Sequence, residues 1–259
     1  MNATKEIESL VTAGNEEVLA MHINLVTNYG TAEDAAYLLA LFLQTKDARL
    51  LKPLQVCGNK AVAETLSQQA IENNQLKENF PPETLLALGY LQHAETEGVL
   101  MAYYQNLIDK KLDWHLHQSV CLALLNYSCE GYEGIIRQQI EKCFELSLFP
   151  EMIPVLACKT GDVALAEKLY NHGSTKASSD SNAGLLLGIA LFGLDQKDLF
   201  KKAIYNPDWE AGSTATGNRT YTMMGLSYLQ ISLAEMLDDI KQLHEGGGDQ
   251  LPGVRDGLK

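Results

Sequence analysis

Side chains that could bind a metal or a ligand are most concentrated in the short segment Asp113–His117, which reads Asp-Trp-His-Leu-His. On a helix, His115 and His117 point to different sides, because residues two positions apart do not share a face. His117 and Cys121 are four positions apart and do share a face, as two ligands of a zinc site would. No third or fourth ligand follows at a spacing typical of such sites. We therefore expect neither a metal centre nor a bound cofactor.

Aromatic side chains around this segment are candidates for contacts with another protein, because Tyr and Trp are enriched among binding hot spots. Tyr103 and Tyr104 are adjacent, so on a helix at most one of the two is fully buried. The candidate contact residues are Tyr103, Tyr104, Trp114, His115, His117 and Trp209. A different interpretation is that the first four of these converge into one pocket that binds a chromophore or another small molecule.

Motifs for nucleotide binding or catalysis are absent from the sequence. The segment Gly212–Arg219 has two glycines five positions apart, but it lacks the Gly-Lys-Ser/Thr ending of a phosphate-binding loop. The serine-hydrolase motif Gly-x-Ser-x-Gly and the zinc-protease motif His-Glu-x-x-His do not occur. Acidic residues are scattered along the chain, and none forms a recognisable catalytic pair. We therefore expect that the protein is not an enzyme.

The balance of charge limits the partners that the chain attracts. Its 33 acidic and 20 basic residues give a formal net charge of −13. Such a surface repels the phosphates of nucleic acids and the anionic surface of membranes. It attracts basic proteins and accelerates their association. The composition therefore favours a protein partner, in particular a basic one, over nucleic acid or membrane.

The cysteines and the apolar stretches indicate the compartment. Five cysteines occur at wide spacings without a Cys-x-x-Cys pair, which is unlike a disulfide framework. The first ten residues lack the apolar core of a signal peptide. The longest uncharged apolar stretch, Ala183–Leu194, has twelve residues, fewer than the about 20 that a membrane-spanning helix needs. We expect a cytoplasmic protein.

Apolar residues recur at helical spacing along almost the whole chain, whereas alternating strand patterns are nearly absent. Starts of helices are indicated by Thr31–Asp34, by Pro81–Glu83 and by Asp162. A long helical segment is expected over Asn59–Asn79. Short connections between short helices make neighbouring helices antiparallel. The sequence thus predicts an all-α fold of helical hairpins.

The sequence also resembles itself at a regular interval. Similar segments join a first to a second helix at five places, which begin with Leu41, Leu88, Leu124, Leu156 and Leu191. These leucines are separated by 47, 36, 32 and 35 residues, and the helical segment Asn59–Asn79 would absorb the excess of the first interval. A two-helix period of 32 to 36 residues is typical of stacked repeat arrays, because one hairpin cannot bury its apolar face alone. The expected fold is an α-solenoid of stacked antiparallel hairpins.

The repeat pattern sets the expected domain organisation. We predict a single helical-repeat domain over residues 1–243. Segment 1–30 is expected to cap its N-terminal end, and a helix over 218–243 to cap its C-terminal end. Residues 244–259 are rich in glycine and are expected to form a flexible tail.

The stretch Ile153–Gly173 resembles one ankyrin unit. It has a proline at the start of the first helix, a Gly-Asp turn, a leucine-rich second helix and a closing glycine. The longer helices of the other hairpins are more similar to HEAT and armadillo repeats. These resemblances imply a concave or ridged surface that binds other proteins.

These observations lead to an expected function and to two alternatives. We expect a non-enzymatic interaction protein that presents an acidic helical-repeat surface to one protein partner, as an inhibitor of the immunity type or a scaffold would. The first alternative is an enzyme or a handler of a cofactor or chromophore on an α/α scaffold. The second is a permanent subunit of a larger assembly. Convergence of the candidate residues in one cavity would favour the first, and a large exposed apolar patch the second.

Overall fold

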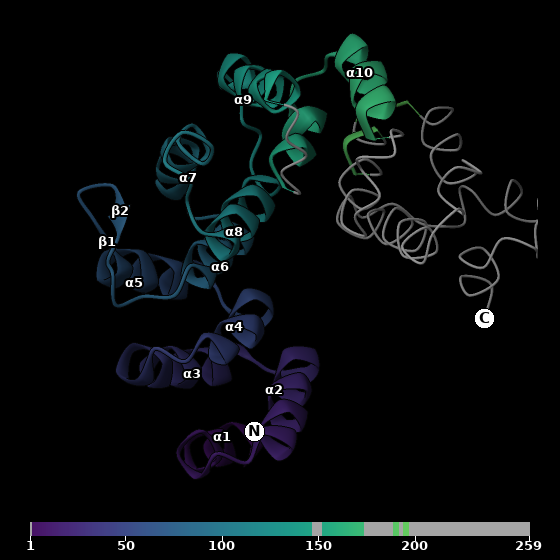
Figure 1. Ribbon diagram of the computed structural model, residues 1–259. Helices are drawn as coiled ribbons and strands as arrows, with labels where there is room; N and C mark the ends of the chain where they lie inside the picture. Colours follow the sequence, from purple (N-terminus) through teal and green to yellow (C-terminus); the bar gives the residue numbers. More distant parts are fainter. Residues whose placement is uncertain (1, 147–151, 174–188, 192–193, 197–259) are drawn as a thin grey trace, which may run out of the picture. The chain divides into compact units, whose positions relative to one another are not determined.

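The computed structural model describes residues 2–146, 152–173, 189–191 and 194–196. Helices account for nearly all regular structure in these ranges, so the all-α prediction is confirmed. In chain order the elements are α1 (Asn2–Ala13), α2 (Glu16–Tyr29), α3 (Ala32–Thr45), the 3-10 helix η1 (Ala48–Leu50), α4 (Leu51–Cys57), α5 (Lys60–Ala70), β1 (Ile71–Glu72), β2 (Gln75–Leu76), α6 (Glu83–Tyr90), α7 (Thr96–Tyr104), α8 (Trp114–Leu124), α9 (Glu133–Glu145), the 3-10 helix η2 (Ile153–Lys159) and α10 (Val163–Gly173) (Figure 1).

The predicted long helix over Asn59–Asn79 is wrong in its second half. α5 ends at Ala70, and a small antiparallel hairpin follows, in which Ile71 pairs with Leu76. The two residues of its turn, Asn73 and Asn74, both have positive φ (52° and 59°). Asn tolerates this left-handed conformation, which two-residue hairpin turns need. The strands are only two residues long, too short to produce an alternating sequence pattern.

The contacts divide the chain into two compact units, Met1–Ser128 and Cys129–Lys259. In the first unit, α2, α4, α6 and α8 pack against one another in chain order. A second row beside them is made by α1, α3 and α5, again packed in chain order (Figure 1). Each even-numbered helix also packs on the odd-numbered helix that precedes it. Helices α1 to α6 of this unit therefore alternate between two layers.

α6 and α8 approach each other most closely at Gly89. A Cβ added there would lie 2.5 Å from the Cβ of Ala123, which is closer than real Cβ contacts allow. Beyond the end of α8, the Tyr127 hydroxyl donates to the backbone oxygens of Leu88 (3.3 Å) and His93 (2.9 Å). Carbonyls near the end of a helix lack intrahelical partners, so this hydroxyl satisfies groups at the C-terminal end of α6. Burial raises the pKa of Tyr127 and keeps it a donor.

α1 is fixed to α3 through a buried carboxylate. Asp34 lies at the third position of α3 and completes a capping box with Thr31, whose backbone N donates to Asp34 Oδ2 at 2.9 Å. The hydroxyl of Thr4, on α1, also donates to Asp34. This last hydrogen bond is the main cause that holds the pKa of Asp34 well below its usual range. The helix start predicted from Thr31–Asp34 is thus confirmed, and the same carboxylate joins two helices.

The five repeated leucines are all buried. Each is followed after four or five residues by a residue of positive φ, and these residues are Lys46, Gln92, Cys129, Gly161 and Asp195. Two of the turns also share a hydrogen bond: His93 N donates to Leu88 O at 3.2 Å, and Gln196 N donates to Leu191 O at 3.0 Å. Such six-residue closures are typical of helix C-terminal ends.

One of the five repeated segments, the one that begins with Leu41, does not correspond to the others in the structure. Leu88 and Leu124 lie on α6 and α8, whereas Leu41 lies on α3, in the other layer. The junction after Leu41 therefore leads from the odd-numbered to the even-numbered helices of the first unit, whereas the junction after Leu88 leads from α6 to α7. The connections that do correspond in the first unit follow α2 at Gly30 and α4 at Gly58. The long first interval of 47 residues arises because the match at Leu41 is out of phase by one helix.

In the second unit, α9 and α10 each pack on η2. Pro154 stands in the first turn of η2 and Gly161 has a φ of +64°. Asp162 Oδ1 accepts from Ala164 N at 3.1 Å and so caps α10, as predicted. The first helix of the ankyrin-like stretch Ile153–Gly173 is, however, a 3-10 helix and not an α-helix. An ion pair joins Arg137 Nε to Asp162 Oδ2 at 3.0 Å.

No helix within the described ranges combines the length and the hydropathy that crossing a membrane requires.

Candidate functional site

The adjacent tyrosines of α7 have different surroundings. Tyr104 is fully buried, so its ring packs in the core and is not accessible to a partner. Tyr103 is half-buried, and its hydroxyl accepts a hydrogen bond from Leu76 N at 2.9 Å. Because Leu76 belongs to β2, this bond fixes the β1–β2 hairpin to α7. Of the two tyrosines, only Tyr103 lies partly at the surface.

The two histidines in the first turn of α8, His115 and His117, have different surroundings. Asp113 caps the helix by accepting a hydrogen bond from His115 N at 2.8 Å, as its position predicted. The side chain of His115 is exposed. His117 is half-buried, its Nε2 atom is enclosed without a hydrogen-bond partner, and burial lowers its pKa. Cys121 is fully buried one turn later.

The sequence-predicted residues do not form one site in the part of the chain that the structure describes. His115 is exposed and Tyr104 lies in the core, so these two cannot line a common pocket. No group of three His, Cys, Asp or Glu residues within the described ranges is arranged to hold a metal ion. Trp114 is the first residue of α8. Trp209 and the loop Gly212–Arg219 lie outside the described residues.

A surface that the sequence analysis missed lies on the layer of even-numbered helices. Large apolar side chains are exposed there on three consecutive helices of the layer. They are Met21 (68% exposed), Leu25 (46%) and Tyr29 (72%) on α2, Val56 (63%) on α4 and Tyr90 (40%) on α6. We call these five residues the apolar row.

Three members of the apolar row stand at helix ends that are adjacent to one another. A Cβ added to Gly30, which follows α2, would lie 3.4 Å from the Cβ of Cys57 at the end of α4. A Cβ added to Gly58, which follows α4, would lie 2.7 Å from Cδ2 of Leu91, directly after α6. The C-terminal ends of the three helices therefore lie side by side. Tyr29, Val56 and Tyr90 stand at these three ends.

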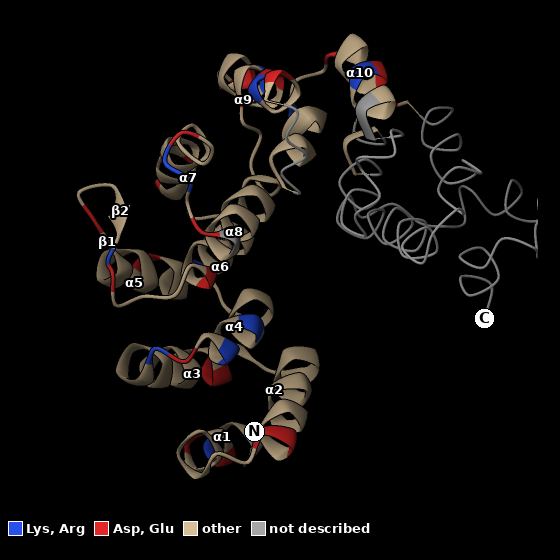
Figure 2. Ribbon diagram, in the orientation of Figure 1, with Lys and Arg blue, Asp and Glu red and all other residues tan. Residues whose placement is uncertain are grey.

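The apolar row lies on helices that carry few charges. Between Glu17 and Glu33 the sequence has no Asp, Glu, Lys or Arg, so α2 has charged residues only in its first turn (Figure 2). Lys52 is the only charged residue of α4, and Glu83 is the only one of α6. Arg49, just before α4, is held by Asp47 and by Glu16 of α2. A partner can thus contact the row without displacing ion pairs from it.

A sequence signal for this surface exists in α2. Leu19, Ile23 and Val26 form the buried stripe of the helix. Met21, Leu25 and Tyr29, at intervals of four, form a second apolar stripe. A helix that is apolar on two sides is normally covered on both. Because one stripe of α2 is exposed, it needs a further partner or a functional reason.

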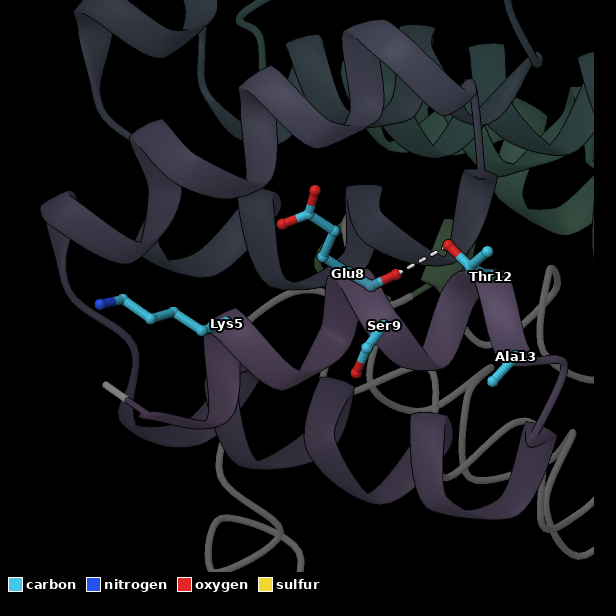
Figure 3. Close-up of a pocket in the computed structure, with 5 residues that line it drawn as sticks. All are labelled: Lys5, Glu8, Ser9, Thr12 and Ala13. Carbon is cyan, nitrogen blue, oxygen red and sulfur yellow. Dashed lines mark hydrogen bonds between the residues drawn. The ribbon is translucent and has the colours of Figure 1, made fainter.

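A hollow of about 450 Å³ runs along α1 and is lined by Lys5, Glu8, Ser9, Thr12 and Ala13 (Figure 3). The Thr12 hydroxyl donates to Glu8 O at 3.1 Å, and the Ser9 hydroxyl donates to Glu6 O at 2.8 Å. Both hydroxyls are therefore engaged by the backbone of their own helix. The hollow has no set of convergent, unengaged polar groups of the kind that orients a ligand.

The chain matches no protein family, no curated protein and no solved structure.

Proposed function

We propose that this protein is a non-enzymatic protein-binding module and that the apolar row is its binding surface. The observation that carries the proposal is the exposure of five large apolar side chains on three adjacent helices of one layer. Exposed aromatic and aliphatic side chains grouped on one face are typical of protein interfaces. Tyr29 and Tyr90 belong to a residue type that is enriched among binding hot spots.

The proposed scaffold is an α-solenoid of stacked helical hairpins. The alternation of helices between two layers in the first unit supports it. So do the left-handed turns at Gln92, Cys129, Gly161 and Asp195, which recur at intervals of 37, 32 and 34 residues. In such arrays one layer of helices lines the surface that binds the partner.

The proposed partner is a basic protein, and the proposed compartment is the cytoplasm. The net charge of −13 would attract such a partner over a distance of about one Debye length. The apolar row would then supply the desolvated contact, because charge steers association more than it sets affinity. An inhibitor or a scaffold of this kind needs no catalytic group of its own.

A permanent subunit of a larger assembly is a second candidate, and the same apolar row favours it. The two candidate functions predict different association states for the isolated protein. A transient binding module stays monomeric and folded without its partner, whereas a subunit that has lost its neighbours self-associates through its exposed apolar side chains. Sedimentation of the purified chain over a range of concentrations separates them. We do not propose an enzyme, since the candidate residues lie in different surroundings.

The test is affinity capture from the native cell extract with matched variants. Tyr29→Glu places a charge in the apolar row, and Gln68→Glu places the same charge on the exposed side of α5. We expect the wild-type chain and Gln68→Glu to retain one stoichiometric protein that high salt releases. We expect Tyr29→Glu, with an unchanged circular dichroism spectrum, to lose it. Equal capture by all three chains, or a bound metabolite in place of a protein, would contradict the proposal.

A further inference from the structure

The apolar row ends where three helix C-termini lie side by side. The last carbonyls of a helix carry a partial negative charge, which basic residues in the last turn normally offset. None of α2, α4 and α6 has a basic residue in its last turn. These ends, after Tyr29, Cys57 and Tyr90, lie side by side, but the starts of α3 and α5 follow two of them directly and offset part of this charge.

The side chains at these ends suit a cation that has an apolar stem. The ring of Tyr29 is 72% exposed, and the face of an aromatic ring attracts the guanidinium of Arg and the ammonium of Lys. Val56, 63% exposed on the neighbouring helix, offers an apolar surface for the methylenes of such a side chain. A lysine or arginine of the partner could contact Tyr29 and Val56 in this way while its charged end stays in contact with water.

The formal charges around these helix ends determine which part of the apolar row attracts a cationic side chain of the partner. Lys52 lies one turn before Val56 on α4, and Lys60 begins α5; both are exposed and repel a cation on the α4 side. Glu33 lies just after Tyr29, beyond the short connection into α3. It is exposed and forms no ion pair within the described part of the chain. Glu33, four residues after Tyr29, is the exposed negative charge that is nearest to it in the sequence, so we assign the attraction for a cation to this part of the surface.

We infer that the partner places an arginine or lysine, carried on an otherwise apolar segment, against Tyr29 and Glu33, with its neighbouring apolar side chains on Met21, Leu25 and Val56. This inference rests on the proposed function, and it names the chemistry of the partner at the same surface. A neutral apolar segment would leave Glu33 without a counter-charge, and an acidic segment would be repelled by it.

The test is a selection of random twelve-residue peptides, displayed on phage, for binding to the full-length chain. Parallel selections use the variant Tyr29→Ser with Val56→Ser, which removes the surface, and Gln68→Ser, which changes the exposed side of α5. We expect the wild type and Gln68→Ser to enrich peptides that combine apolar residues with at least one Arg or Lys. We expect the double variant to bind these peptides at least about tenfold more weakly.

The enriched peptides then test the cation itself. Replacing its Arg by citrulline removes the charge at constant shape and should weaken binding about two- to fivefold, as for an exposed cation–π contact. Glu33→Gln should weaken binding of the Arg peptide but not of the citrulline peptide. The matched control Glu64→Gln, at an exposed position of α5, should change neither.

The outcomes separate the two proposals. Peptides that need Tyr29 and Val56 but carry no cation, or that bind equally with citrulline, overturn the inference and leave the binding surface in place. Enriched peptides that ignore the double substitution overturn the proposed function as well. Self-association that is lost in the double variant would show that a second copy of the chain covers the row, and it would also overturn the inference.

Discussion

At the scale of the single residue, His117 and His22 give the fold opposite responses to pH. Burial lowers the pKa of His117, so below about pH 6.5 the unfolded chain takes up its proton more readily than the folded chain. The stabilising contribution of neutral His117 is therefore present above that pH and is lost on acidification. We expect His117→Gln to flatten the fall in the free energy of unfolding between pH 7 and pH 5. Urea denaturation at each pH measures it.

His22 serves as the internal contrast for this experiment. Its Nδ1 atom pairs with Val18 O at 2.8 Å and its Nε2 with Glu6 at 2.7 Å, and these contacts raise its pKa. Its contribution is fully present below about pH 6.5 and is lost as the pH rises through the raised value. His22→Gln should therefore steepen the fall on acidification that His117→Gln flattens. If both variants change the slope in the same direction, the assignment of these roles is wrong.

At the scale of the element, the contact between α6 and α8 depends on a missing methyl group. Gly89→Ala would place its Cβ 2.5 Å from that of Ala123, so the two helices must separate. The expected cost is about 1–3 kcal/mol, typical of overpacking, which outweighs the about 0.5–1 kcal/mol that Ala otherwise gains over Gly in a helix. Thermal unfolding followed by circular dichroism should show a lower midpoint.

The matched control for this substitution is Gly134→Ala on α9. Nothing lies within 4 Å of a Cβ added at Gly134, and it lies within a helix. Because Gly134 lies in the first turn of α9, the same chemical change should be neutral or stabilise the helix by at most about 0.5–1 kcal/mol. Two changes in the same direction would mean that helix propensity, and not the α6–α8 contact, governs the effect at Gly89.

Local chemistry made many helix starts predictable from the sequence, whereas contacts between helices were not predictable. Thr31, Asp113 and Asp162 cap helices through their own side chains, so residue type and position suffice. The turn at Asn73 and Asn74 breaks a helical pattern over too few residues to detect. The sequence pattern assigns the segment at Leu41 to the wrong helix of the repeat because helices in both layers end in similar sequences. Only the packing shows which layer a helix occupies.

The exposure of the apolar row could not be predicted from the sequence, for a related reason. α2 has two apolar stripes, and the sequence does not state which of them the neighbouring helices cover. Of the contact candidates predicted from the sequence, Tyr103 lies partly at the surface and His115 is exposed, while Tyr104 belongs to the core. Residue type alone cannot separate a buried tyrosine from an exposed one on adjacent positions of a helix.

At the scale of the whole molecule, the division into two units predicts that the first unit folds alone. One hydrophobic cluster, from Ile7 on α1 to Leu88 on α6, lies entirely within the first unit. A chain of residues 1–128 should therefore unfold in one cooperative thermal transition with a helical circular dichroism spectrum. The row on α2, α4 and α6 should remain available in it for peptide binding.

The shorter chain 1–104 shows whether the end of this unit is correctly placed. It retains α1 to α7 but loses α8, which packs on both α6 and α7 and which contacts Gly89 through Ala123. Because α6 and α7 would then expose the side chains that pack on α8, we expect a broad transition and binding of a hydrophobic dye. A cooperative 1–104 would show that α8 is not needed to close the core. A non-cooperative 1–128 would show that the helices of the first unit depend on residues 129–259 for their stability.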